Sequence, residues 1–224
     1  VVGGDMEIYE NAALLTLDLA TLTVVLGEIE LYMNVNLTSI DLASLESTGG
    51  DLDITFHDSL KSIDLSSITL IKDELWLRKN ASLLKVVIPN LEKVGGDMDI
   101  DKNPSLLNIA GLEKLKTVGG RVWVRDNSEL QTINLSNLQS IADELEVNGN
   151  TALLSLDLSA LNSVGAELKI YDNPALKTLD LSELPALDSE LVISSNIALV
   201  VVDLSKLKTV NTFFHIYGHP ALTT

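Results

Sequence analysis

Residues 165–187 read GAELKIYDNPALKTLDLSELPAL, and variants of this phrase of about 23 residues fill the chain from end to end. Each copy has a small or acidic pair, an apolar-x-apolar triplet, an Asn, and then spaced leucines around Leu-Asp-Leu. A fixed period in this range is typical of solenoids, in which each copy is one turn and buries its apolar face only against its neighbours. The sequence therefore predicts a single solenoid domain over residues 1–224, with nine full turns and a partial tenth.

Within one turn, apolar and polar residues alternate over short stretches, which indicates strands with one buried face. Leu168 and Ile170 form one such pattern, and Leu179 and Leu181 form a second. Leu187 is a third inward anchor before the next corner. Asn and Pro mark the corner between the strands, and no stretch has room for a helix of ordinary length. We therefore expect an all-β fold, a parallel β-solenoid with a core of stacked aliphatic layers.

One polar position recurs in every turn, directly after the first strand. It is Asn in eight turns and His in two: Asn11, Asn34, His57, Asn80, Asn103, Asn127, Asn150, Asn173, Asn196 and His219. A stacked polar side chain at a corner can satisfy backbone groups in the turns above and below it. We therefore predict a structural corner column. The alternative, that the two histidines are catalytic or metal ligands, is disfavoured because they lie seven turns apart.

The composition excludes several classes of partner. Lys and Arg total 15 against 32 Asp and Glu, which gives a formal net charge of −17. A surface this acidic repels nucleic acid phosphate and anionic lipid. The chain has no Cys, and therefore no disulfide, thiolate metal site or thiol nucleophile. No apolar run approaches the length of a transmembrane helix, so we expect no direct membrane insertion of this segment.

The acidic residues fall into two columns along the stacked turns. The first column precedes the first strand and contains Asp5, Glu28, Asp51, Glu74, Asp97, Glu144, Glu167 and Glu190. The second column lies in the second strand and contains Asp18, Asp41, Asp64, Asp157, Asp180 and Asp203. The favoured interpretation is a solvated face that keeps the strands soluble. Calcium bridging successive carboxylates is the alternative, because Ca²⁺ takes several oxygen ligands at once. No calcium-loop motif is present, so we expect no cofactor.

Two tryptophans interrupt the acidic face in the middle of the chain. Trp76 and Trp123 share one outward column with Asp99 between them, and the neighbouring column reads Arg78, Asp101, Arg125. Alternating Arg and Asp at one-turn spacing predicts a ladder of cross-strand ion pairs. These pairs could simply neutralise the middle of the sheet while the Trp rings shelter them. The functional alternative is a flat patch of exposed Trp and Arg that binds a sugar, a peptide or another copy of the protein. The candidate patch consists of Trp76, Arg78, Asp99, Asp101, Trp123 and Arg125.

The phrase Gly-Gly-Asp-Met-Asp-Ile-x-x-Asn-Pro-x-Leu at 95–106, with Leu-Asp-Leu-Ser-x-Leu in other copies, resembles the receptor L domain family. That family includes the ligand-binding L domains of insulin- and EGF-type receptors, fungal cell-wall proteins and many microbial surface proteins. The chain is most similar to the Cys-free microbial members. The resemblance implies a right-handed parallel β-helix with leucine-rich-repeat-like stacking, displayed outside the cell. It implies no catalytic residue, since no catalytic motif belongs to the family.

The sequence contains no nucleophile–base arrangement, phosphate-cradling loop or metal-ligand spacing, so we expect that the protein is not an enzyme. We predict an extracellular or cell-surface protein that binds a protein or glycan ligand, or mediates adhesion, through the outward face of the first strands. The alternative is a structural subunit. The chain opens at Val1-Val2, at the end of a repeat, and stops at Thr224 within another, which is typical of a fragment of a longer array. Open ends could stack into a filament, sheath or cell-wall layer.

Overall fold

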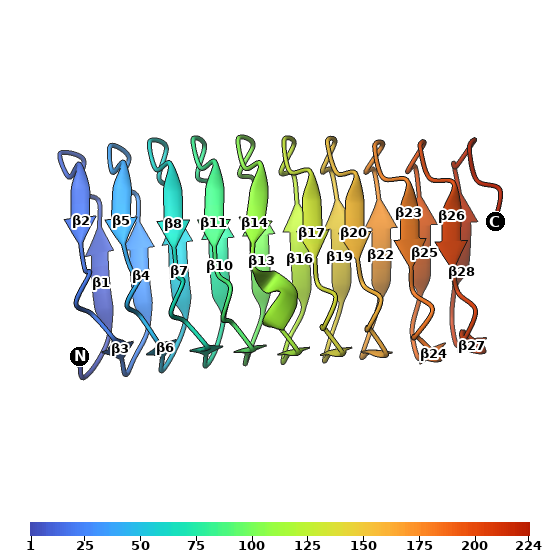
Figure 1. The fold of residues 1–224 in the computed structure, drawn as a ribbon, viewed down its shortest axis with the longest axis horizontal. Helices are drawn as coiled ribbons and strands as arrows, with labels where there is room; N and C mark the ends of the chain where they lie inside the picture. The colour runs from blue at the N-terminus through green and yellow to red at the C-terminus, as the bar shows by residue number, and fades with distance from the viewer.

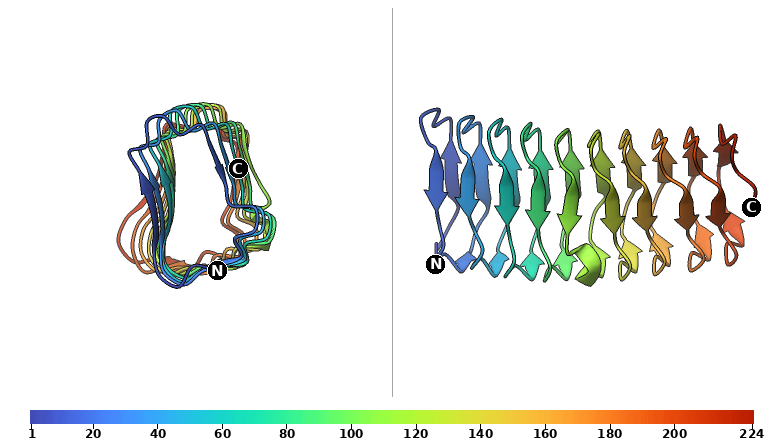
Figure 2. Two further views of the ribbon diagram at one scale, coloured as in Figure 1. Left: turned by 90° about the vertical axis from the view of Figure 1, so that its left-hand side faces the viewer. Right: turned by 45° about the horizontal axis from the view of Figure 1, so that its top comes forward.

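Each repeat folds into one coil of three short strands, and the coils stack in parallel along the length of the molecule (Figure 1). The structure is a computed structural model that describes residues 1–224. Seen along its long axis, the coils superpose in one outline (Figure 2). The protein is thus an all-β parallel solenoid, as the repeat predicts. No helix is long and apolar enough to cross a membrane.

The first strands of the coils form a ten-stranded parallel sheet. In spatial order it contains β1 (Met6–Tyr9), β4 (Ile29–Tyr32), β7 (Leu52–Thr55), β10 (Leu75–Arg78), β13 (Met98–Asp101), β16 (Val122–Arg125), β19 (Leu145–Asn148), β22 (Leu168–Tyr171), β25 (Leu191–Ser194) and β28 (Phe214–Tyr217). Partners are one repeat apart, as in Leu168↔Leu191. Every repeat position is therefore a column of side chains that runs across the sheet, with about 4.8 Å between neighbours.

The second strands form a nine-stranded parallel sheet. It contains β2 (Thr16–Asp18), β5 (Ser39–Asp41), β8 (Ser62–Asp64), β11 (Lys85–Val87), β14 (Asn108–Ala110), β17 (Thr132–Asn134), β20 (Ser155–Asp157), β23 (Thr178–Asp180) and β26 (Val201–Asp203). Between β14 and β15 the coil holds one extra residue, so that Met98 pairs with Val122, 24 positions on. A single 3-10 turn, η1 (Leu112–Lys114), lies in this corner, and the register of the sheets continues beyond it.

The third side of each coil is a strand of two residues, where the sequence indicates only an apolar anchor. These strands are β3 (Val24–Val25), β6 (Ser47–Thr48), β9 (Leu70–Ile71), β12 (Lys93–Val94), β15 (Thr117–Val118), β18 (Ser140–Ile141), β21 (Ser163–Val164), β24 (Ala186–Leu187) and β27 (Thr209–Val210). They form a seven-stranded and a two-stranded parallel sheet. Two residues are too few to display an alternating pattern, so the sequence gives no sign of a third sheet.

The interior is one continuous aliphatic core. Its 53 buried apolar residues are Leu, Ile and Val with a single Met, and no aromatic ring is among them. Each coil contributes inward residues from all three strands, such as Leu168, Leu179 and Leu187, all almost completely buried. The predicted stacked aliphatic layers are confirmed.

The corner column links the backbones of successive coils. Its interior members, from Asn34 to Asn196, are fully buried, whereas Asn11 is exposed and His219 is half-buried. In all seven buried Asn members the amide oxygen accepts the backbone N–H of the preceding column member, and the amide nitrogen donates to a carbonyl of the preceding strand. Asn103 accepts from Asn80 N at 3.1 Å and donates to Leu77 O at 2.8 Å. These side chains hold successive coils together at a corner where the backbone leaves the sheet.

His57 fills the same corner with an imidazole. Its Nδ1 lies 3.3 Å from the carbonyl oxygen of Asn34, and its Nε2 lies 3.1 Å from that of Leu31. Burial lowers the pKa of His57, and the two carbonyls oppose that shift. The Nε2 contact matches that of an Asn amide nitrogen in this column, whereas Nδ1 faces the Asn34 carbonyl and the ring accepts no N–H from Asn34. Both ring nitrogens thus contact the backbone of the preceding coil, and the ring is accounted for by the fold.

Candidate binding surface

The outward face of the ten-stranded sheet is acidic toward both ends and electroneutral in the middle. Residues 5–10, 28–33 and 51–56 contain seven acidic side chains and no basic one. Residues 144–149, 167–172 and 190–195 contain five acidic side chains and one Lys. Between them, residues 74–79, 97–102 and 121–126 contain five of each sign. A partner that docks at the centre of this face meets the smallest net charge and therefore removes the least charge from water.

At the centre, two tryptophans flank a buried carboxylate. Trp76, Asp99 and Trp123 are register partners on β10, β13 and β16, as their shared column predicts. Asp99 is only 1% exposed and Asp101, two positions along β13, is 4% exposed. Burial raises the pKa of Asp99, although the nearby guanidinium groups of Arg78 and Arg125 oppose the shift.

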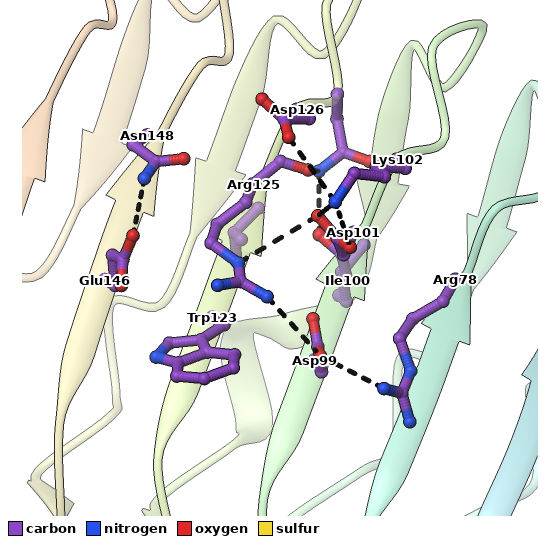
Figure 3. Close-up of polar contacts among 12 residues, drawn as sticks. Arg78, Asp99, Ile100, Asp101, Lys102, Trp123, Arg125, Asp126, Glu146 and Asn148 are labelled. Atoms are coloured by element: carbon purple, nitrogen blue, oxygen red, sulfur yellow. Dashed lines mark hydrogen bonds and ion pairs between the residues drawn. The ribbon is translucent and has the colours of Figure 1, made fainter.

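The arginines on the two neighbouring strands converge on Asp99 (Figure 3). Its Oδ2 lies 3.7 Å from Arg78 Nη1 and 3.9 Å from Arg125 Nη2. Asp101 pairs with Arg125 Nε at 3.9 Å and with Lys102 Nζ at 3.1 Å. The predicted ladder Arg78–Asp101–Arg125 is therefore only half present, because Arg78 pairs with Asp99 instead of Asp101.

Stacking of arginine on tryptophan explains that difference. The guanidinium carbon of Arg78 lies 3.9 Å from the Trp76 ring centroid, which turns the group toward the tryptophan column and away from Asp101. Two guanidinium carbons lie over the Trp123 ring, that of Arg121 at 3.5 Å and that of Arg125 at 3.9 Å. The expectation of exposed tryptophans is wrong, since both are half-buried beneath these groups.

Arg121 lies outside the patch that the sequence predicts. It precedes β16 at a position that is acidic in eight other coils, and its Nε lies 3.1 Å from Asp97 Oδ2. The signal was present in the sequence as the one basic residue in that column. We refer to Trp76, Arg78, Asp99, Asp101, Arg121, Trp123 and Arg125 as the Trp–Arg cluster.

Unpaired polar atoms are concentrated on this part of the sheet. Six buried side-chain atoms form no hydrogen bond within the chain, and all six lie in or beside the cluster: Glu74 Oε2, Trp76 Nε1, Arg78 Nε, Asp99 Oδ1, Arg121 Nε and Arg125 Nε. Buried polar atoms are nearly always paired, and an unpaired one costs about 1–3 kcal/mol. The cluster therefore holds buried donors and acceptors that the chain itself leaves without a hydrogen bond.

The second acidic column has a different role, in turn formation. In all six of its Asp residues, Oδ1 accepts the backbone N–H two positions on, at 2.9–3.2 Å. Asn134 continues the pattern at 3.1 Å. In the first column, Asp5, Asp51 and Asp97 each accept the backbone N–H of the residue at the same position in the next coil. One oxygen of each of these carboxylates thus belongs to the fold, and no group of three or more His, Asp or Glu is arranged to hold a metal ion.

Next to the cluster, Glu146 on β19 is fixed by two donors. Tyr171 Oη donates to its Oε1 at 2.7 Å, and Asn148 Nδ2 donates to the same oxygen at 2.5 Å. Burial, together with the hydrogen bond to the carboxylate, raises the pKa of Tyr171 from 10.0 to about 12.

We expect one tyrosine to ionise late in an alkaline titration followed by tyrosinate absorbance, and Tyr171→Phe to remove that step. Because the folded chain holds this proton more tightly than the unfolded chain, the contribution of Tyr171 to stability is complete below pH 10.0 and is lost as the pH rises toward about 12. Tyr171→Phe should flatten the fall in stability over that interval. A late step that persists in Tyr171→Phe would contradict the assignment.

Comparisons with known proteins do not assign the chain to a family. No protein-family model matches it, and no curated protein matches its sequence. A solved structure that matches is a leucine-rich repeat protein from Bacteroides ovatus ATCC 8483. The two are 13% identical, the match covers 89% of this chain and 75% of that chain, and the TM-score is 0.27. A score this low carries no argument, so the fold rests on the chain's own structure, a parallel β-solenoid. Membership of the receptor L domain family stays a prediction.

Proposed function

We propose that this chain is a non-enzymatic binding protein whose Trp–Arg cluster contacts a protein ligand outside the cell or at its surface. The observation that carries the proposal is the concentration, in and beside the cluster, of all six buried polar atoms that form no hydrogen bond. Only two of them lie in ion pairs, Arg121 Nε with Asp97 at 3.1 Å and Arg125 Nε with Asp101 at 3.9 Å. A protein partner supplies backbone and side-chain groups that can pair with the others once the side chains that cover them move aside. The extracellular setting is supported by the resemblance of the repeats to receptor L domains.

The composition and stiffness of the cluster favour a protein interface. Trp and Arg are the residue types most enriched among those that dominate binding energy. Each guanidinium group stacked on a ring is held in place before binding, which reduces the entropy lost on association. The cluster also lies between flanks of like negative charge, so an acidic partner is repelled by the flanks and meets the least repulsion at the neutral centre.

A glycan is the less favoured ligand for the cluster itself. Sugars bind tryptophan by stacking on an open ring face, but guanidinium groups of Arg121 and Arg125 already lie over Trp123. A protein ligand can instead pack against ring edges and the outer planes of the arginines.

The test is capture of proteins from the surface fraction of the source cells and their surroundings by the immobilised chain. Trp76→Ala combined with Trp123→Ala should abolish capture, because truncation of an interface residue of this kind costs about 2 kcal/mol, or roughly thirtyfold in affinity, for each. The matched control is Tyr32→Ala combined with Tyr217→Ala, two aromatic residues of the same sheet outside the cluster. Capture should survive in that variant.

Circular dichroism should show an intact sheet in both double variants. A protein captured equally well by the chain without its tryptophans would exclude the cluster as the interface. If the unmodified chain bound to a glycan array and the variant without the tryptophans did not, the ligand of the cluster would be a saccharide instead of a protein.

A further inference from the structure

The same sheet contains a polar hollow beside the Trp–Arg cluster. It has a volume of about 320 Å³ and is lined by eight residues from four successive coils, of which Tyr171 alone is hydrophobic. Asp126, Gly149 and Asp172 come from the corner position that precedes the buried Asn column. Glu146 and Asn148 come from β19.

The hollow exists because Gly149 has no side chain. Its corner position has a positive φ in every coil, and eight coils place a residue other than Gly there, including Lys79 at 55° and Lys102 at 54°. Gly149 itself has φ 65°, about 10° from those two lysines. The backbone therefore does not require Gly here, and a larger residue would fill the space. A Cβ on Gly149 would lie 2.5 Å from Asp126 Oδ1, the end of a side chain that can move, and 3.3 Å from the backbone nitrogen of Asp126.

The groups around the hollow include both donors and acceptors, and they are held in place. Glu146 is fixed by Tyr171 Oη and Asn148 Nδ2. Lys102 Nζ lies 3.7 Å from Asp126 Oδ2, so an ammonium group also reaches the rim. Asp126 lies one coil before Gly149 and Asp172 lies one coil after it. Two strand spacings place these aspartates about 10 Å from each other.

This mixture selects against charged ligands. An anion would meet the carboxylates of Asp126, Glu146 and Asp172. A cation would meet the positive charges of Lys102 and Arg125, and the side chains are not arranged to hold a metal ion. A sugar hydroxyl is neutral and both donates and accepts hydrogen bonds, so several hydroxyls on one ring can use carboxylate, amide and ammonium groups together. The apolar side of such a ring matches the single hydrophobic residue, Tyr171.

We propose that this hollow is a saccharide site that binds one neutral pyranose unit. The inference goes beyond the protein-binding role of the Trp–Arg cluster and does not depend on it.

The test uses the whole purified chain and four probes, the methyl glycosides of D-glucose, D-galactose, D-mannose and N-acetyl-D-glucosamine, with binding followed by ligand-observed NMR and calorimetry. At least one should bind saturably. Gly149→Lys should weaken it tenfold or more, because the lysine fills the hollow on a backbone that already carries Lys at two other coils. Gly218→Lys is the matched control, since Gly218 occupies the same corner position at φ 77° in the last coil. It should leave binding unchanged.

A second variant, Glu146→Gln, keeps the size of the side chain and removes its charge, and should weaken binding without changing the thermal midpoint. Trp76→Ala alone, which keeps Arg125 stacked on Trp123, should leave sugar binding intact, so this site and the protein interface can fail separately. Lack of saturable binding by all four glycosides would overturn the proposal. So would equal binding by Gly149→Lys, or equal competition from the acyclic polyol sorbitol.

Discussion

Asn103→Ala should lower the free energy of unfolding by about 4 kcal/mol and the thermal midpoint by roughly 10 °C. Asn103 accepts the backbone N–H of Asn80 at 3.1 Å and donates to the carbonyl oxygen of Leu77 at 2.8 Å and of Asp101 at 3.2 Å. Alanine leaves the buried N–H of Asn80 without a partner, at about 1–3 kcal/mol, and removes the donor that the two carbonyls share. Thermal and denaturant unfolding followed by circular dichroism measures the change.

Two variants in the same column test the cause of this loss. Asn11→Ala removes an exposed member, whose amide nitrogen donates to Tyr9 O at 3.0 Å, and should cost less than about 1 kcal/mol. Asn103→His should recover part of the loss, because His57 already makes two carbonyl contacts at this position. If Asn11→Ala and Asn103→Ala were equally destabilising, burial within the stack would not explain the effect.

Features that depend on the backbone period could be predicted from the sequence. The solenoid, its strands and the columns all follow from the repeat, because each coil places equivalent residues in register. The buried Asn column is such a feature, and so is the row Trp76–Asp99–Trp123. The third sheet could not be predicted, since its two-residue strands are shorter than the pattern that identifies a strand.

Features that depend on the direction of long side chains could not be predicted from columns. Arg78 and Asp101 are register partners, yet stacking on Trp76 turns the guanidinium toward Asp99. Arg121 is the one basic residue in a column that is acidic in eight other coils, and the column pattern alone does not show that its side chain turns onto Trp123. The hollow at Gly149 could not be predicted, because the sequence does not show that the corner has a positive φ even where the residue is not Gly. Only with that φ does a glycine at the corner indicate missing side-chain volume.

Gly95→Ala should destabilise the chain by about 3 kcal/mol, the upper part of the range for overpacking, because a backbone atom blocks the new methyl group. Gly95 follows β12 and leads into β13. A Cβ there would lie 1.8 Å from the carbonyl oxygen of Lys72 in the preceding coil. A flexible side chain could move aside, but this carbonyl cannot move without shifting one coil against the next. Gly3→Ala is the matched control at the same repeat position, since nothing lies within 4 Å of its Cβ, and it should be nearly neutral.

The same substitution should also disturb the Trp–Arg cluster. β13 carries Asp99 between the two tryptophans, so a shift of this coil changes the surroundings of both rings. We expect altered tryptophan fluorescence in Gly95→Ala at temperatures well below its unfolding transition, and an unchanged spectrum in Gly3→Ala. An unchanged spectrum in a destabilised Gly95→Ala would mean that the corner yields locally. In that case the position of Asp99 would be set by the arginines around it, and the register of the coils would matter less to the binding surface than the packing of Arg78 and Arg125.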